Sequence, residues 1–203
     1  MSALTHFDAL PLQMDAQSKA ISSPSSNRAL TTELEALNTL HRTLLGLETP
    51  HGIPPPPVPV NPKRSAGVAK LRDSGNGEFR KGKFPDAIRF YTLGIQMALQ
   101  RPPWEPNQLV REEVAGLYAN RAQAHMALTQ WAEGSVDAEA SVEARKVGNA
   151  KAWWRRGRCL QEMGRLEEAR EWVRRGLGME GEEAELVALL REIETRIARG
   201  SKA

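Results

Sequence analysis

Large apolar residues and small residues recur in register over the C-terminal two thirds of the chain. Five columns of such residues keep the same two intervals, 47 and 35 residues. The columns are Gly75, Ala122 and Gly157; Phe84, Trp131 and Leu166; Ala87, Gly134 and Ala169; Tyr91, Ala138 and Val173; and Gly94, Ser141 and Gly176. Because small residues let helices approach closely and large ones fill a core, the pattern predicts a helical hairpin repeated about every 34 residues. The first interval is longer, and the proline-containing residues 101–111 are predicted to supply most of the excess as an inserted connection.

This spacing is typical of the tetratricopeptide repeat, a family that the chain resembles. The resemblance implies an all-α fold, a right-handed superhelical solenoid of three helix hairpins at about residues 68–101, 115–148 and 150–183. A further helix over residues 182–199 carries a stripe of apolar residues and is predicted to cap the array, because the last repeat would otherwise expose its apolar face. The repeat domain is expected to span residues 65–199.

Residues 1–53 are predicted to form a region that binds a partner protein. A helical pattern begins near residue 30, where Thr32 and Glu35 fit a capping box, and Gly46 is expected to end it. The stripe has no mate in the flanking residues 1–28, which are not expected to fold alone, so it needs another polypeptide or, as the alternative, the repeat domain. The apolar stripe comprises Leu30, Leu34, Leu37, Leu40 and Leu44, and the predicted partner contacts are Leu30, Leu34, Leu37 and Leu44.

Residues 54–64 contain four consecutive prolines and are predicted to be an extended linker. Proline fixes φ and has no N–H to donate, so such a run forms a stiff spacer. A ligand for a proline-recognition domain is the alternative interpretation.

Composition and motifs narrow the function classes. Cys159 is the only cysteine, which excludes an intrachain disulfide and a cysteine-based zinc site and indicates a reducing compartment. No stretch approaches the roughly 18 apolar residues of a membrane span, so any membrane attachment is expected to come from a partner. The four histidines show no metal-ligand spacing, and neither a nucleophile triad nor a glycine-rich phosphate loop is evident. Neither an enzyme nor a cofactor is therefore expected.

The first helix of each hairpin in such an array lines a concave groove, and helical spacing decides which residues face it. The predicted groove residues are Arg72, Asn76, Phe79 and Arg80 in the first repeat, Asn120, Gln123 and Met126 in the second, and Lys151, Arg155 and Arg158 in the third. No acidic residue is expected at the centre. Because cations neutralise carboxylates and carboxamides donate hydrogen bonds to them, the groove is predicted to bind a free C-terminus that also carries an acidic side chain.

Five of these positions are similar to the two-carboxylate clamp of tetratricopeptide co-chaperones: Arg72, Asn76, Asn120, Lys151 and Arg155. Arg72 departs from the family pattern, since it stands where lysine is usual and offers a planar fork in place of a point donor. The resemblance implies binding to tails ending in Glu-Glu-Val-Asp on the seventy-kilodalton and ninety-kilodalton heat-shock chaperones. Phe79 and Trp154 lie near the groove face and either contact the valine of the tail or pack internally.

Residues 48–62, 70–99 and 101–106 carry a closer resemblance. The first stretch reads ETPHGIPPPPVPVNP and the last RPPWEP, and all three look like the tetratricopeptide subunit of the fungal endoplasmic-reticulum protein-translocation complex. The resemblance implies a peripheral subunit on the cytosolic face, whose N-terminal region grips a membrane-anchored sister subunit. The implied function is a non-enzymatic adaptor for post-translational import, whose groove captures a chaperone that carries a precursor protein.

Two alternatives stay open. Basic residues crowd the third repeat, and Arg156, Arg170 and Arg174 fall off the groove face, where they suit contacts to phosphates of a nucleic acid or a ribosome. In the other alternative, the chain's own N-terminal segment occupies the groove. The adaptor hypothesis expects neither a nucleic-acid partner nor direct membrane insertion.

Overall fold

The computed structural model describes residues 10–25, 27–46, 60 and 62–200. The chain divides into two compact units, residues 1–58 and 59–203. The four consecutive prolines of the predicted linker lie outside the described residues. Within the described ranges, no helix combines the length and apolar character needed to cross a membrane.

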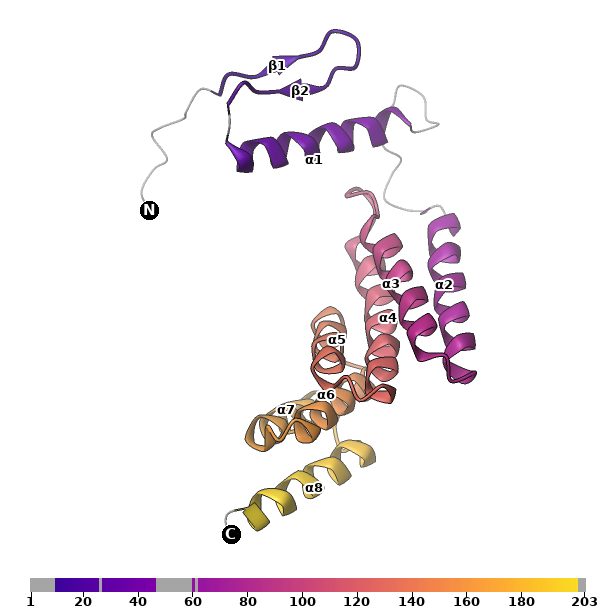
Figure 1. Ribbon diagram of the computed structural model, residues 1–203, viewed down its shortest axis with the longest axis vertical. Helices are drawn as coiled ribbons and strands as arrows, with labels where there is room; N and C mark the ends of the chain where they lie inside the picture. The colour runs from indigo at the N-terminus through magenta and orange to yellow at the C-terminus, as the bar shows by residue number, and fades with distance from the viewer. Residues whose placement is uncertain (1–9, 26, 47–59, 61, 201–203) are drawn as a thin grey trace. The chain divides into compact units, whose positions relative to one another are not determined.

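The N-terminal unit contains a β-hairpin next to one helix (Figure 1). Strands β1 (Gln13–Met14) and β2 (Ile21–Ser22) pair antiparallel, and helix α1 spans Arg28–Leu45. Asn38 joins the helix to the hairpin: its Oδ1 accepts a hydrogen bond from the Ile21 N–H and its Nδ2 donates to the Ile21 carbonyl, both at 2.8 Å. The prediction that this helix has no mate in the flanking residues is therefore wrong.

The start of α1 also differs from the prediction. Its N-cap is Asn27, whose side-chain oxygen accepts hydrogen bonds from two backbone N–H groups of the first turn. The predicted capping box of Thr32 and Glu35 lies inside the helix, where the Thr32 hydroxyl donates to a backbone carbonyl of the preceding turn. Asparagine is among the strongest N-cap residues, so the helix begins one turn earlier than expected. It ends at Gly46, as predicted.

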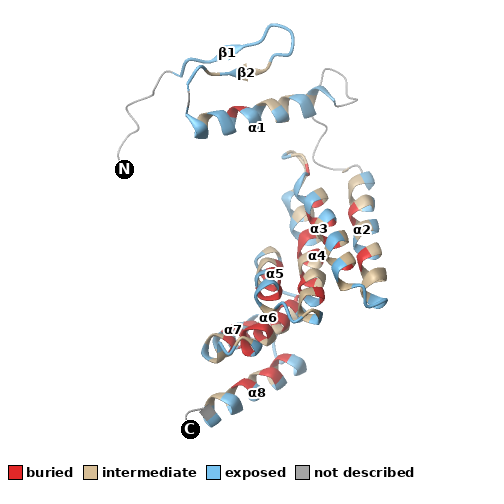
Figure 2. Ribbon diagram, viewed as in Figure 1, coloured by how far each residue is buried: buried red, intermediate tan, exposed pale blue. Residues whose placement is uncertain are grey.

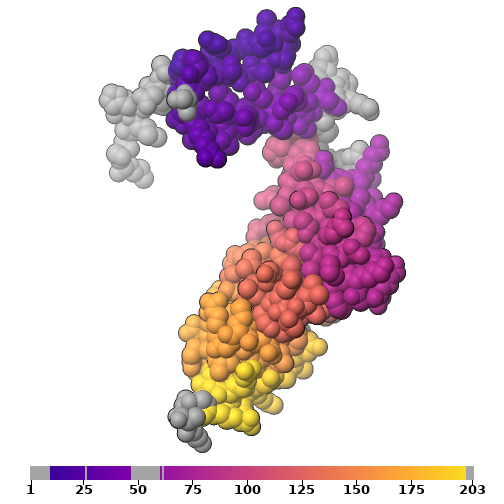
Figure 3. Space-filling model, viewed as in Figure 1, coloured from indigo at the N-terminus to yellow at the C-terminus, as the bar shows by residue number. Residues whose placement is uncertain are grey.

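The C-terminal unit consists of three helix hairpins and a final helix (Figure 1). The elements are α2 (Pro62–Arg80) and α3 (Phe84–Leu99), α4 (Asn107–Ala127) and α5 (Trp131–Ala144), α6 (Ala150–Glu162) and α7 (Leu166–Glu180), and then α8 (Ala184–Gly200). Each helix packs on the next, and α8 also packs on α6, so that α2 to α8 form one continuous body (Figure 3). The predicted all-α solenoid of three hairpins with a capping helix is confirmed, apart from the small N-terminal hairpin.

The repeated columns of the sequence meet one another inside each hairpin. A Cβ added to Gly75 would lie 2.5 Å from the ring of Tyr91, and one added to Gly157 would lie 2.5 Å from the Val173 side chain. Each pair joins the first and second helices of a hairpin and combines the same two columns. The missing side chain lets the helices touch, which explains why small and large columns recur together. Figure 2 shows the buried residues where neighbouring helices face each other.

The long first interval differs in part from the predicted insert. Only residues 100–106 separate α3 from α4, and the rest of the predicted connection forms the first turn of α4. Arg101 anchors the loop with a side chain that is 1% exposed. It donates hydrogen bonds to Glu105 and Glu113 and to the Ser65 hydroxyl. The loop thereby ties the start of α2 to α4.

Candidate functional site

The first helices of the three hairpins and the start of α8 line a cavity of about 990 Å³. All five residues of the predicted clamp line it: Arg72, Asn76, Asn120, Lys151 and Arg155. Helical spacing explains the convergence, because the pair on α2 and the pair on α6 are each four residues apart and therefore share a helix face. Stacking of the hairpins then brings the three first helices to one side of the unit.

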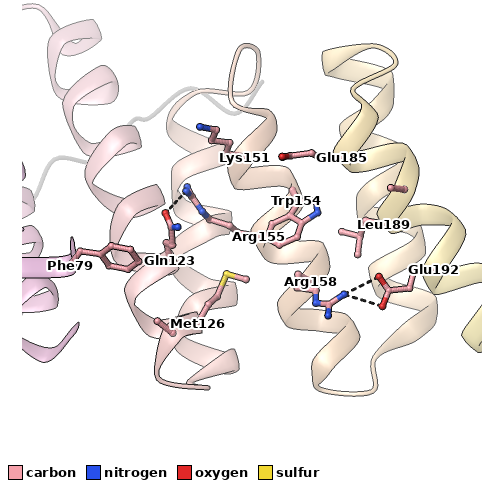
Figure 4. Close-up of a pocket in the computed structure, with 12 residues that line it drawn as sticks. Phe79, Gln123, Met126, Lys151, Trp154, Arg155, Arg158, Glu185, Leu189 and Glu192 are labelled. Carbon is pink, nitrogen blue, oxygen red and sulfur yellow. Dashed lines mark hydrogen bonds and ion pairs between the residues drawn. The ribbon is translucent and has the colours of Figure 1, made fainter. Parts of the chain in front are cut away.

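A second cavity of about 720 Å³ adjoins the first, since Gln123, Lys151 and Arg155 line both. Apolar side chains from four helices form most of its remaining wall: Phe79, Met126, Trp154 and Leu189 (Figure 4). The two cavities are together called the groove below. Phe79 and Trp154 also pack against the core clusters of the repeats, so each both fills the interior and lines the groove.

Two asparagines of the groove are hydrogen-bonded to each other, and a buried tyrosine holds one of them. The Asn76 Oδ1 accepts hydrogen bonds from the Tyr91 hydroxyl at 2.8 Å and from Asn120 Nδ2 at 3.1 Å. Burial raises the pKa of Tyr91, so its hydroxyl stays protonated and donates. Because the Asn76 oxygen is occupied, its NH₂ group is left to donate, and it has no partner in the described part of the chain. The two carboxamides are thus held as donors at the cavity wall.

Arg155 is a buried cation that no carboxylate of the described residues pairs with. The residue is 8% exposed, and its Nη2 donates to the neutral Gln123 Oε1 at 2.7 Å (Figure 4). Among the residues that the structure describes, no carboxylate oxygen lies within 4.0 Å of its guanidinium. Burial lowers the pKa of Arg155 below its ordinary value, an effect that the Tyr91 hydroxyl and the Glu185 carboxylate partly offset. A buried charge without a counter-charge is costly, so this position is suited to receive an anion.

Two other arginines, buried Arg101 and partly buried Arg121, show the opposite arrangement. Burial alone would lower the pKa of Arg101, but the carboxylates of Glu113 and Glu105 more than offset it and raise the pKa. Arg121 donates two hydrogen bonds of 2.7 Å to the carboxylate of Asp137, which raises the pKa of that guanidinium. The fold therefore neutralises its structural arginines internally and leaves the groove arginine without such a partner.

Two residues predicted to bind the ligand do not fit that role. Arg158 lines the smaller cavity, but its Nη1 lies 2.9 Å from Glu192 Oε2 (Figure 4). Its Nε also lies 3.1 Å from Glu162 Oε1. These contacts neutralise its charge, so it is not a free cation of the groove. Arg80 lines neither cavity, so its predicted place in the groove is corrected as well. Helical spacing alone could not show that α8 would bring a carboxylate to Arg158.

The two remaining predicted cations of the groove, Arg72 and Lys151, are exposed and available. Arg72 Nε lies 3.5 Å from Asp73 Oδ1, and both side chains are largely solvent-accessible. Such exposed pairs contribute at most about 1 kcal/mol, so a ligand carboxylate can displace this one. Lys151 makes no ion pair with any residue that the structure describes.

The structure adds charged residues to the groove that the sequence analysis did not predict, among them Arg145, Glu183 and Glu185. Arg145, in the loop before α6, lines the larger cavity with a side chain that makes no hydrogen bond or ion pair within the described residues. Glu183, just before α8, lines the larger cavity, and Glu185, in the first turn of α8, lines both. The expectation of a centre without acidic residues did not anticipate these carboxylates in the wall of the groove. None of these residues lies in a repeated column, because Arg145 is in the connection between two hairpins and the two glutamates belong to the capping segment.

Arginines of the basic third repeat are mostly paired within the fold. The ion pairs are Arg156 with Glu139, Arg170 with Glu167, and Arg174 with Glu194, and the Arg156 guanidinium also lies 4.1 Å from the centre of the Trp172 ring. Neighbouring carboxylates thus balance the charges that phosphate binding would need. The nucleic-acid alternative gains no support from this surface.

Metal and thiol chemistry find no basis in the described ranges. They contain no group of three or more His, Cys, Asp or Glu side chains arranged to hold a metal ion. Cys159 is buried, and burial raises the pKa of its thiol to about 12. The thiol therefore stays protonated at neutral pH and is a poor nucleophile.

Comparison with known proteins decides the family. No protein-family model matches the sequence. The chain is 37% identical over 143 residues to the ER protein translocation subcomplex subunit sec67 of Schizosaccharomyces pombe, which covers 70% of this chain and 74% of that protein. The chain belongs to the Sec67 family. This Sec67-family chain is also 27% identical over 190 residues to the translocation protein SEC72 of Saccharomyces cerevisiae, covering 92% of the chain and 96% of SEC72.

Solved structures share the fold of the Sec67-family chain. A chain in the cryo-EM structure of the Sec complex from S. cerevisiae matches it with a TM-score of 0.73 at 26% identity, covering 93% of this chain and 98% of that one. The first tetratricopeptide domain of Spaghetti (RPAP3), bound to the HSP90 peptide SRMEEVD, matches with a TM-score of 0.55 at 27% identity, covering 70% and 98%. The second such domain of human RPAP3, in complex with the HSP70 peptide SGPTIEEVD, has a TM-score of 0.54 at 27% identity, covering 64% and 98%.

The resemblance to the tetratricopeptide subunit of the fungal translocation complex is thus confirmed. The relatives are protein-translocation subunits, and the Sec67-family chain is accordingly a non-enzymatic protein. Its repeats have the fold of domains that hold chaperone peptides in other proteins.

Proposed function

We propose that this Sec67-family protein is an adaptor that binds the acidic C-terminal tail of a cytosolic heat-shock chaperone of the seventy-kilodalton class, with the ninety-kilodalton class as the second candidate. The observation that carries the proposal is the buried Arg155, which is held by Gln123 and has no carboxylate partner among the described residues. Two proteins of similar fold are bound to peptides that end in Glu-Glu-Val-Asp. On the cytosolic face of the endoplasmic reticulum, such capture would raise the local concentration of precursor proteins for post-translational translocation.

The last residue of such a tail carries two carboxylates, and the groove offers two sets of donors. Lys151 and Arg155 form one cationic wall, while Arg72 lies with the amides of Asn76 and Asn120 on the other side. Each charge-assisted contact contributes about 1.5 to 3 kcal/mol before the cost of ordering the ligand. A short flexible tail should therefore bind with a Kd on the order of micromolar. Weak and reversible binding suits an adaptor that must release its chaperone.

The smaller cavity supplies an apolar surface beside these cations. Phe79, Met126 and Leu189 face it from three different helices. We assign the valine of the tail to this surface, where burial of a side chain of that size contributes about 1.5 to 3 kcal/mol. The apolar wall would thereby distinguish an acidic tail that contains valine from one that carries only charge.

A tail peptide with a free C-terminal carboxylate is expected to bind the full chain at least about tenfold more tightly than the same peptide with a C-terminal amide. Amidation removes one negative charge and the contact that it makes with the cations of the groove. Isothermal titration calorimetry measures both affinities, with a scrambled peptide of equal charge and a free carboxylate as the control. Equal affinity for the acid and amide forms contradicts the proposal.

We further propose that the N-terminal unit attaches the protein to a membrane-anchored sister subunit. Large apolar side chains of this unit are exposed: Leu10, Leu12, Met14, Leu37 and Leu45, with exposures from 49% to 67%. Exposed apolar side chains on so small a unit favour a protein partner. The Sec complex that contains a chain of this fold supports the same assignment.

The four leucines predicted to contact this partner differ in exposure. Leu37 is exposed, Leu30 and Leu44 are half-buried, and Leu34 is only 7% exposed. Leu34 therefore belongs to the core of the unit itself and is not available to a partner. The predicted stripe is divided between internal packing and the proposed interface.

Leu37→Asp is expected to abolish co-purification with the sister subunit from detergent-solubilised membranes. Leu37 is 51% exposed, so the substitution should change the stability of the isolated unit little. A charge buried in an apolar interface, in contrast, weakens association by about 2 kcal/mol or more. Thr39→Asp adds the same charge on the opposite face of α1 and should leave the association intact. Retention of the subunit by Leu37→Asp, with α1 still helical by circular dichroism, argues against this interface.

A further inference from the structure

Glu185 brings a carboxylate into the groove beside the two cations of α6. It lies in the first turn of α8 and lines both cavities, as do Lys151 and Arg155. Figure 4 shows its side chain reaching from α8 toward Lys151. It is exposed, and it makes no hydrogen bond or ion pair with any described residue. The carboxylate is therefore near the cations without neutralising either of them through direct contact.

The other acidic side chains of the α8 side are engaged or placed elsewhere. Glu180 accepts hydrogen bonds of 3.0 and 2.6 Å from two backbone N–H groups before α6. Glu192 is paired with an arginine across the smaller cavity, and Glu183 lines only the larger one. In the described part of the chain, Glu185 is thus the acid that is common to both cavities and free of a partner.

We propose that Glu185 is a specificity-determining residue of the groove, which disfavours an acidic ligand side chain beside Lys151 and Arg155 and favours a neutral or basic one there. The inference rests on the proposed function, because it assigns a charge preference to the same site. A ligand carboxylate brought next to Glu185 meets a like charge, and such juxtaposition rejects a ligand as effectively as missing contacts do. The groove then combines a receptor for terminal carboxylates with a charge filter for the residues that precede them.

Glu185 already interacts electrostatically with Arg155, the cation that is proposed to bind the ligand carboxylate. Burial lowers the pKa of Arg155, and the Glu185 carboxylate partly offsets that effect. The same carboxylate therefore lowers the positive potential that a second anion meets at this place. Removing its charge should strengthen the attraction of the groove for acidic tails.

A double-mutant cycle between protein and peptide tests this coupling. The full chain and Glu185→Gln are titrated with a peptide ending in Glu-Glu-Val-Asp and with peptides in which each glutamate in turn is replaced by glutamine or lysine. Glu185→Gln is expected to bind the unmodified peptide about two- to fivefold more tightly, as expected for exposed charges. Replacing one particular peptide glutamate should cancel this gain. The gain should also vanish in about 1 M salt, where the Debye length is about 3 Å.

Glu182→Gln provides the matched control, because this exposed residue lies on the same segment and lines neither cavity. It should bind every peptide as the unsubstituted chain does. Unchanged binding by Glu185→Gln overturns the inference, and weaker binding also overturns it, because Glu185 would then serve to hold the cations in place. In both cases a preference of the unsubstituted chain for the acid form over the amide form still supports the proposed function. If neither chain binds the acid form, the charge filter and the proposed function both fail.

Discussion

Arg155→Met is expected to remove most tail binding while leaving the protein folded. The guanidinium is buried in the groove and contacts no carboxylate of the described residues, so a ligand carboxylate would supply the missing anionic partner. Loss of one charge-assisted contact of about 1.5 to 3 kcal/mol lowers the affinity by about tenfold to a hundredfold. Isothermal titration calorimetry with the acid-form peptide measures this change.

The same substitution separates binding from stability. Methionine fills a similar volume, and its apolar side chain avoids the cost of burying a charge that has no counter-charge. The Gln123 oxygen that loses its donor is on an exposed residue, so water can replace the hydrogen bond. Urea unfolding should therefore show a free energy of unfolding that is unchanged or higher. A large loss of stability would mean that Arg155 is structural, as Arg101 is.

Arg72→Met is the informative comparison on the opposite wall of the cavity. Arg72 is exposed and its only ion pair in the described residues is with Asp73 at 3.5 Å, so its contribution to binding is screened by water. A smaller loss of affinity than for Arg155→Met is expected. If the two substitutions weaken binding equally, burial of Arg155 is not what makes it the stronger contact.

The helical fold could be predicted from sequence because the residues in the repeated columns are the ones that pack against one another. Gly75 and Tyr91 recur with their counterparts at fixed intervals because each small residue receives a large one from the second helix of its hairpin. The five clamp positions could be placed for a related reason, since a residue four positions along a helix returns to the same face. Periodicity within helices thus carries both the core and the groove.

What escaped prediction lies where that periodicity stops. Arg145 is in a connection, and Glu185 follows the last repeat, so no column marks either of them. The pairing of Arg158 depends on how far α8 crosses the smaller cavity, which helical spacing within α6 does not determine. The contact between Asn38 and the β-hairpin likewise joins residues whose association no repeat could reveal.

Arg101 and Arg155 show how the same residue type serves two purposes in one fold. Both are buried, with 7% and 8% of the whole residue exposed. The pKa of Arg101 is raised because its two carboxylate partners outweigh burial, whereas the pKa of Arg155 is lowered by burial that no direct carboxylate contact offsets. The presence or absence of an internal anion therefore separates an arginine that stabilises the fold from one that is prepared for a ligand.

Arg101→Ala is accordingly expected to lower the free energy of unfolding by about 3 to 5 kcal/mol, because it leaves two mostly buried carboxylates without their counter-charge. The side chains of Glu105 and Glu113 are only 15% and 16% exposed, so water cannot fully replace the guanidinium. Urea unfolding measures the loss. Arg158→Ala removes an arginine with more exposed partners and should cost about 1 kcal/mol or less. The triple variant Arg101→Met, Glu105→Gln and Glu113→Gln removes all three charges together and should recover most of the stability. If it is no more stable than Arg101→Ala, then packing of the loop, and not unpaired charge, explains the loss.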